Sequence, residues 1–201
     1  MFVCFTTATF GSLISSSFMS LYEKVVAFVD ISFHDVLQKR HFEKTVFWFE
    51  RFLPGLTEAH RIAAYAHDSE RAFRDETKRV PQNYLDADFL RYHCEKGAEI
   101  IGIFLSENGA GEADIEKVKH LISGHEFGGD LEQTALMDAD SVSYFETAVE
   151  MFVSKRASIQ GYEKIKEKLD WMFNRISSPE RKAFAKENYE KWSIELEKSK
   201  K

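Results

Sequence analysis

The sequence predicts an all-α fold, and three observations support this class. Ten glycines and three prolines in 201 residues are too few for the many turns of a β-sandwich or barrel. Apolar side chains recur at three- and four-residue spacing through most of the chain, which is typical of amphipathic helices. The hydrophobic residues make up 44% of the chain, including 18 phenylalanines, which is enough for a sizeable core and excludes a largely disordered chain.

Five elements are expected in the first half of the chain. In order, they are a helix from Leu21 to about Val29, a helix over His34–Leu53 with Val36 and Leu37 among its apolar positions, a short buried helix over Glu58–Asp68, a charged loop over Arg71–Tyr84, and a helix over Asp88–Leu105. The Pro54-Gly55 pair stops the second helix, and Thr57 can cap the third. Pro81 and the high charge around it favour a surface loop, of the kind that often covers a site.

Glycine-containing turns separate the helices expected in the second half. In order, they are a helix capped by Asp114 with Ile115, Val118, Leu121 and Ile122 inward, a flexible turn of Gly124, Gly128 and Gly129 around His125, a long helix over Leu131–Val153 with Leu131, Ala135, Val142, Phe145, Val149 and Phe152 at helical spacing, and a closing helical pair over Tyr162–Ile176 and Pro179–Lys198. Ser178 directly precedes Pro179, which is the pattern of an N-cap followed by proline at the first helical position.

The first 22 residues carry no charged side chain. The stretch Met1–Thr9 lacks the basic residues of a signal peptide, and serines and threonines between positions 6 and 17 dilute the apolarity that a membrane span needs. We therefore expect residues 1–18 to be an extension outside the core, and residues 19–201 to form one helical domain. A membrane or export role for the extension is the alternative.

Charge and cysteine content narrow the expected environment. A net charge of −6 opposes a surface that coats nucleic acid, so neither a nucleic-acid nor a membrane partner is expected. Cys4 and Cys94 are the only two cysteines and cannot form a disulfide scaffold. A reducing cytoplasm is therefore the expected location.

Histidines and acids in apolar helical segments are the strongest functional signal. The residues concerned are His41, His67, Asp68, His93, His125 and Asp140. Burying carboxylates such as Asp68 and Asp140 is costly without a cation. Imidazole and carboxylate ligands together suit a divalent ion such as Mn, Fe, Co, Ni, Zn or Mg. The alternative is a set of buried polar residues that hydrogen bonds alone satisfy.

The order of these residues and the segments around them carry a resemblance to one protein family. A histidine, a His-Asp pair and a distal aspartate occur as His41, His67-Asp68 and Asp140, and the neighbouring segments are YHCEKGAEIIGIFL, IEKVKHLISGHE and LMDADSV. In these features the chain resembles the all-helical HD-domain metal-dependent phosphohydrolases. The segments GYEKIKEKLDWMF and PERKAFAKENYEKW are similar to the C-terminal helices of small bacterial members. The resemblance implies an HD-domain helical bundle with a metal-binding core over about 36–153 and a closing helical pair over about 160–198.

The resemblance also implies a set of metal ligands. The ligands implied for one divalent ion are His41, His67, Asp68 and Asp140. His93 and His125 would hold a second ion, with Asp68 bridging the two, or would donate hydrogen bonds to a phosphate. Asp138, two positions before Asp140, is the alternative to Asp140 as a ligand.

The implied activity is hydrolysis by a metal-activated water. The substrate would be a phosphoester or phosphoanhydride of a nucleotide or of another small phosphorylated compound. Asp68 is the expected catalytic ligand, and Glu70 could orient or deprotonate the water. The basic residues that could pair with a substrate phosphate are Arg40, Lys44, Arg71 and Lys96. Residues 141–144 depart from the Arg-Leu-Asp that often follows the Asp-Ala-Asp run in small bacterial members, which concerns a substrate contact and not the metal ligands.

Two other functions fit the same residues. A di-iron site for oxygen chemistry would use the six histidines and aspartates as its ligands. A ligand-sensing or interaction module would instead contain a structural metal and would turn over no phosphoester. The remaining histidines, His34, His60 and His120, are expected to be structural or exposed.

Overall fold

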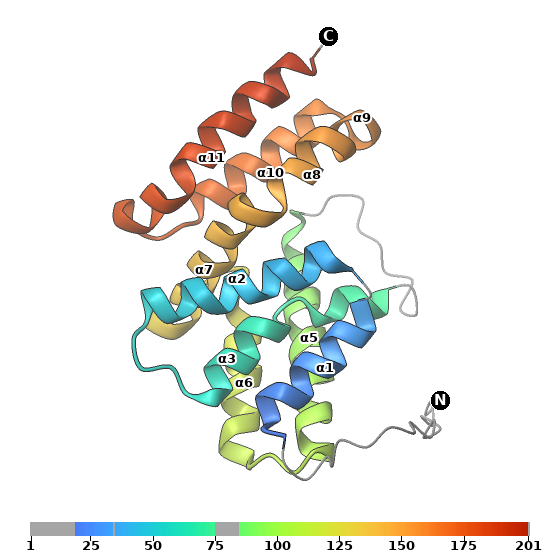
Figure 1. Cartoon of the computed structure of the whole chain (residues 1–201), viewed down its shortest axis with the longest axis vertical. Helices are drawn as coiled ribbons and strands as arrows, with labels where there is room; N and C mark the ends of the chain where they lie inside the picture. The colour runs from blue at the N-terminus through green and yellow to red at the C-terminus, as the bar shows by residue number, and fades with distance from the viewer. Residues whose placement is uncertain (1–18, 34, 75–84, 201) are drawn as a thin grey trace.

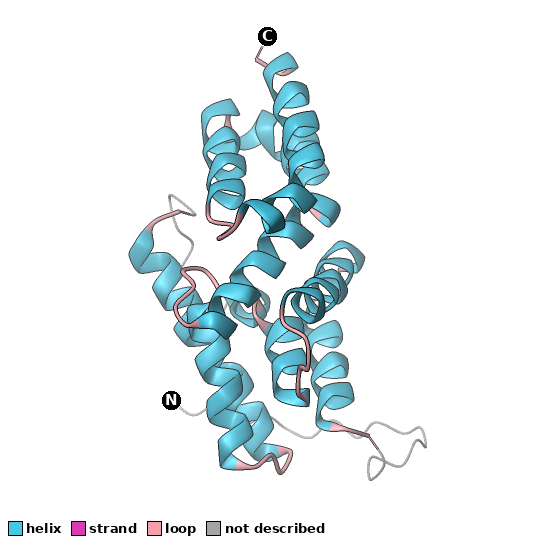
Figure 2. Cartoon of the chain, turned by 90° about the vertical axis from the view of Figure 1, so that its left-hand side faces the viewer, coloured by secondary structure: helices cyan, strands magenta, loops and turns pink. Residues whose placement is uncertain are grey.

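The computed structural model describes residues 19–33, 35–74 and 85–200, and these residues form helices and no strand (Figures 1 and 2). The all-α fold predicted from the sequence is therefore confirmed. The expected extension over residues 1–18, His34, and residues 75–84 of the expected loop lie outside the described residues. None of the described helices has the length and apolarity needed to cross a membrane.

The described elements follow one another with short connections. They are α1 (Leu21–Phe33), α2 (Val36–Phe52), α3 (Glu58–Ala66), the 3₁₀ helix η1 (Ser69–Phe73), α5 (Ala87–Glu107), α6 (Glu112–Gly124), α7 (Leu131–Thr147), α8 (Val149–Met151), the π-helical segment η2 (Phe152–Arg156), α9 (Ala157–Gln160), α10 (Tyr162–Asn174) and α11 (Pro179–Lys198).

Helix α7 connects two groups of helices. In Figure 1, α1 to α6 lie in the lower part of the molecule and α8 to α11 in the upper part, and α7 runs from one into the other. It packs against α2 in the lower group and against α11 in the upper group. Leu136, Val142 and Phe145 of α7 are buried, as are Phe42 and Phe49 of α2, so both groups share one apolar core.

Two predicted helix starts were wrong by a few residues. Asp86, not Asp88, caps α5, because the Asp86 carboxylate accepts a hydrogen bond from the Phe89 amide at 2.8 Å. Gly111, not Asp114, precedes α6, and Asp114 lies in the first turn of that helix. In the first turn a carboxylate still interacts favourably with the helix dipole, so the sequence pattern alone did not separate the two positions.

The start of α2 and the end of α3 also differ from the predicted ranges. Asp35 caps α2 by accepting a hydrogen bond from the Leu37 amide at 2.8 Å. Helix α3 ends at Ala66, so His67 and Asp68 lie in the turn that follows it. A turn frees adjacent side chains from the fixed spacing of about 100° that a helix imposes. His67 and Asp68 can therefore point towards neighbouring positions.

Three apolar positions expected to face the core are exposed. Val36 and Leu37 of α2 and Leu131 of α7 have exposed fractions of 82%, 45% and 69%. All three lie in the first turn of a helix, where periodicity does not show whether another element covers the side chain.

The predicted long helix over Leu131–Val153 was wrong. Helix α7 ends at Thr147, and the chain continues through Ala148 into the short α8 and the π-helical segment η2. A π-helical turn changes the angular register of a helix, and such turns often occur at functional sites. No glycine or proline lies in this stretch, so the sequence gave no sign of the interruption.

Candidate metal centre

The six candidate ligands come from five separate parts of the fold. His41 lies on α2, His67 and Asp68 follow α3, His93 lies on α5, His125 follows α6, and Asp140 lies on α7. All six side chains are buried, with exposed fractions of 6% or less. The structure brings them together into two adjoining groups of three.

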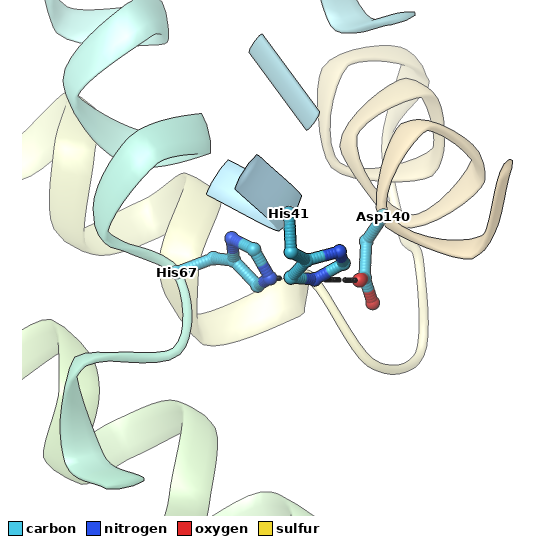
Figure 3. Close-up of side chains that lie close together, drawn as sticks. All are labelled: His41, His67 and Asp140. Carbon is cyan, nitrogen blue, oxygen red and sulfur yellow. Dashed lines mark ion pairs between the residues drawn. The ribbon is translucent and has the colours of Figure 1, made fainter. Parts of the chain in front are cut away.

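The first group consists of His41, His67 and Asp140, and Figure 3 shows the three side chains converging. The Nε2 atom of His41 lies 3.1 Å from Asp140 Oδ1, and the Nε2 atom of His67 lies 3.5 Å from the same oxygen. One ligand atom from each residue lies within 4.8 Å of the other two. The three atoms can therefore surround one ion.

The second group consists of Asp68, His93 and His125. The Nε2 atoms of His93 and His125 lie 3.1 Å and 4.0 Å from Asp68 Oδ1. The other oxygen of Asp68, Oδ2, lies 3.7 Å from His67 Nε2 in the first group. Asp68 thus presents one oxygen to each group.

Hydrogen bonds hold the outer nitrogen of each histidine ring. The Nδ1 atoms of His67 and His125 lie 2.9 Å and 2.7 Å from the carbonyl oxygens of Ala64 and Ile122. A carbonyl can only accept, so Nδ1 carries the proton and Nε2 of each ring presents a lone pair to the site. These two Nε2 atoms are buried and have no hydrogen-bond partner among the described residues. A buried polar atom without a partner is uncommon in proteins, and a metal ion would satisfy both atoms.

The other two ligand histidines have side-chain partners. Ser143 Oγ lies 2.7 Å from Nδ1 of His41, and Glu70 Oε2 lies 2.8 Å from Nδ1 of His93. A carboxylate behind a ligand histidine is a recurring arrangement at metal sites, because it orients the ring and makes it a better donor.

The electrostatics of the two groups favour a bound cation. Burial lowers the pKa of His67, but the negative charges of Asp68 and Asp140 outweigh burial and raise this pKa to about 8. The carboxylates thus attract positive charge to the place where a metal would bind. Burial also lowers the pKa of His125, to about 4, so its ring is neutral at pH 7, which is the form that binds metals.

Glu126 and Arg175 are part of this site, and the sequence analysis missed both. Glu126 Oε1 lies 3.8 Å from Nε2 of His125 and 4.0 Å from Nε2 of His93. Arg175, at the end of α10, forms ion pairs with Asp140 and with Glu126. Burial alone would raise the pKa values of Asp140 and Glu126, but the Arg175 guanidinium outweighs it and lowers both. Glu126 directly follows His125, which was the only sequence signal for it.

The carboxylate of Glu70 contacts His93 and Arg74. Glu70 is fully buried, and Arg74 Nε donates a hydrogen bond to its second oxygen at 3.2 Å. This placement suits a residue that orients His93. The expected role of Glu70 in activating water stays a prediction.

The structure places Asp140, and not Asp138, beside the histidines. Asp138 points towards the C-terminal helices, where it accepts a hydrogen bond from the Ser177 amide at 2.8 Å and pairs with Arg181 at 2.6 Å. The two aspartates are two positions apart on α7, about 200° around the helix, so they serve opposite sides.

A pocket of about 520 Å³ opens onto the first group. His41, His93, Glu126 and Asp140 line it together with five basic side chains, Arg71, Arg74, Arg156, Lys164 and Lys168. Arg71 is the one predicted phosphate contact among these five, and its Nε lies 3.0 Å from Asp68 Oδ1.

The other three predicted phosphate contacts do not line this pocket. Arg40 is exposed, Lys44 pairs with Glu146 at 3.0 Å, and Lys96 pairs with Glu99 at 2.9 Å.

Two further histidines lie outside both groups. His60 is buried, and its Nδ1 accepts a hydrogen bond from the Thr57 amide at 3.1 Å at the start of α3. His120 is exposed on α6 and pairs with Asp130 at 2.7 Å. Both placements agree with the structural or surface positions expected for them.

Comparisons with known proteins add no assignment to this geometry: no family model, no curated protein and no solved structure matches the chain. The site itself is therefore the basis for a functional conclusion. Two buried groups of histidine and aspartate side chains, joined by Asp68, could each hold a metal ion.

Proposed function

We propose that this protein is a metal-dependent phosphohydrolase of the HD-domain type. Its substrate would be a phosphoester or phosphoanhydride of a nucleotide or of another small phosphorylated compound. One observation carries the proposal: two adjoining groups of metal-binding side chains lie at a pocket lined by five basic residues. The groups suit divalent ions, and the basic residues suit a phosphate.

The side chains fit divalent ions by their chemistry. Each group offers two imidazole nitrogens and a carboxylate, a mixture that suits Mn, Fe, Co, Ni, Zn or Mg. The unpartnered Nε2 atoms of His67 and His125 are the donors that bound ions would satisfy. Asp68 has one oxygen near each group, so it would bridge two ions.

The proposed chemistry divides between a metal and this chain's own residues. A bound divalent ion lowers the pKa of a water from about 15.7 towards 7 and stabilises negative charge on a phosphoryl oxygen. Arg71 lines the pocket next to Asp68 and would pair with the phosphate during the reaction. Arg175 fixes the carboxylates of Asp140 and Glu126 from the opposite side.

Metal analysis combined with a phosphate-release assay tests the proposal. We expect the purified protein to contain up to two divalent ions per chain and to release phosphate from nucleotides or p-nitrophenyl phosphate. His67→Ala or Asp68→Ala should abolish both metal content and hydrolysis, with helical circular dichroism largely intact. His120→Ala is the matched control, because His120 is exposed and remote from both groups. Hydrolysis by either ligand variant at the parent rate would contradict the mechanism.

A di-iron oxygenase is the second candidate, because the two triads supply six ligands to an adjoining pair of ions. This function predicts coloured protein with two irons per chain and no phosphate release. The five basic side chains in the pocket favour phosphate hydrolysis over this alternative. Metal-containing protein that turns over neither kind of substrate would instead indicate a sensing or interaction module.

A further inference from the structure

The basic residues of the pocket fall into two classes. Arg71 and Arg74 form ion pairs with Asp68 and Glu70, beside the metal-binding groups. Arg156, Lys164 and Lys168 also line the pocket, but no carboxylate of the described residues lies within 4 Å of them. Their charges are therefore available to a ligand.

The three unpaired cations come from elements that follow α7. Arg156 ends the π-helical segment η2, and Lys164 and Lys168 lie one turn apart on α10. Like charges at this spacing destabilise a helix, so the fold gains nothing from placing two lysines there. The metal ligands come from α2, α3, α5, α6 and α7, so the pocket has a metal side and a separate cationic side.

Aromatic rings support two of these cations. The ammonium of Lys168 lies 4.6 Å from the ring centroid of Trp171, and the guanidinium of Arg156 lies 4.6 Å from that of Phe152. Contacts of this kind fix the direction of a cation without neutralising its charge. Burial lowers the pKa of Lys168 to about 8, so this ammonium would gain stability from an anion beside it.

We propose that Arg156, Lys164 and Lys168 form a second phosphate site, so that the preferred substrate carries two separate phosphate groups. One phosphate would lie at the metal groups and the other at this cationic site. This inference rests on the proposed phosphohydrolase function. Phe89, Leu90 and Ile165 line the same pocket and would contact an apolar or aromatic part of the substrate between its phosphates. A pocket of about 520 Å³ is large enough for such a molecule.

The test compares adenosine 5′-monophosphate with adenosine 3′,5′-bisphosphate as probes for the metal-loaded full-length protein. Calorimetry measures the Kd of each probe, and phosphate release measures kcat/KM. We expect the bisphosphate to bind about tenfold to a hundredfold more tightly, as charge-assisted hydrogen bonds to one phosphate would give. Lys168→Met should remove most of this preference, and Lys168→Arg should keep it.

Lys166→Met is the matched control for the loss of one positive charge from α10. Lys166 lies on the same helix but pairs with Asp170 at 2.5 Å and does not line the pocket. The control should therefore keep the full preference for the bisphosphate. Thermal unfolding of all three variants shows whether a change in binding comes from a loss of folded protein.

The outcomes separate this inference from the proposed function. Equal Kd values for both probes, or the same loss of preference in Lys166→Met and Lys168→Met, would overturn the second phosphate site. If the monophosphate is still hydrolysed in that case, the phosphohydrolase function stands without it. A Lys168-dependent preference for the bisphosphate without phosphate release would keep the site and overturn hydrolysis.

Discussion

Replacing Arg175 with methionine should destabilise the metal-free protein far more than the metal-bound protein. Arg175 is 7% exposed in its side chain and forms ion pairs with Asp140 and Glu126, whose side chains are 8% and 2% exposed. Methionine keeps much of the apolar volume but leaves two buried carboxylates without a counter-charge. Removing one partner of a buried ion pair costs about 3–5 kcal/mol. For a chain of this size, that corresponds to a fall in Tm of roughly 6–20 °C.

A bound divalent ion should recover part of this loss. The ion would interact directly with Asp140 and would lie close to Glu126, so it would supply the positive charge that the substitution removes. Differential scanning calorimetry with EDTA, and then with excess Mn²⁺ or Zn²⁺, measures both states. We expect the gap in Tm between the two states to be larger in Arg175→Met than in the parent, and Arg175→Lys to be intermediate.

Arg181→Met is the matched control for this experiment. Arg181 pairs with Asp138, a buried aspartate on the opposite side of α7 from the metal groups. The control should lower Tm in both states by a similar amount, because no metal ligand loses its partner. The reasoning is refuted if Arg175→Met unfolds at the parent temperature, or if its loss of Tm is the same with and without metal.

Three further outcomes are expected. Ser143→Ala removes the partner of Nδ1 in His41 and should weaken metal affinity about 10- to 100-fold in a chelator competition, whereas Ser158→Ala should leave it unchanged. Phosphate binding should weaken above pH 8, where Lys168 loses its proton because burial has lowered its pKa to about 8; in Lys168→Arg, the pH profile of Kd should stay flat through this range. Phe145→Ala should lower the free energy of unfolding by about 3–5 kcal/mol in urea titrations, because Phe145 is 1% exposed in the core; a loss below 1 kcal/mol would contradict its central position.

The sequence supported the fold because helical periodicity is a local property. The stretches around Val142 and Phe145 repeat apolar residues at the spacing that one buried helix face needs, and the structure has α7 there. The interruption after Thr147 was not predictable, because it involves a π-helical turn in a stretch whose composition still favours a helix. Exposed first-turn residues such as Val36 were mispredicted for a related reason: packing partners decide burial, and periodicity does not identify them.

The candidate site was accessible from the sequence only in part. His41, His67 and Asp140 are chemically unusual in apolar segments, so their type and order drew attention to them. Arg175 is an ordinary residue at the end of a charged helix, and its role depends on tertiary contacts with Asp140, 35 positions earlier. A single sequence does not contain that pairing, because it arises from the way α10 returns onto α7.

The attachment of the C-terminal helices to α7 limits how far the chain could be shortened. A fragment that ended at Arg156 would retain all six candidate ligands, yet it would lack the guanidinium that faces Asp140 and Glu126. It would also leave Asp138 without Arg181. Expression boundaries drawn around the ligands alone would therefore yield an unstable product, and a minimal working unit must extend through α11.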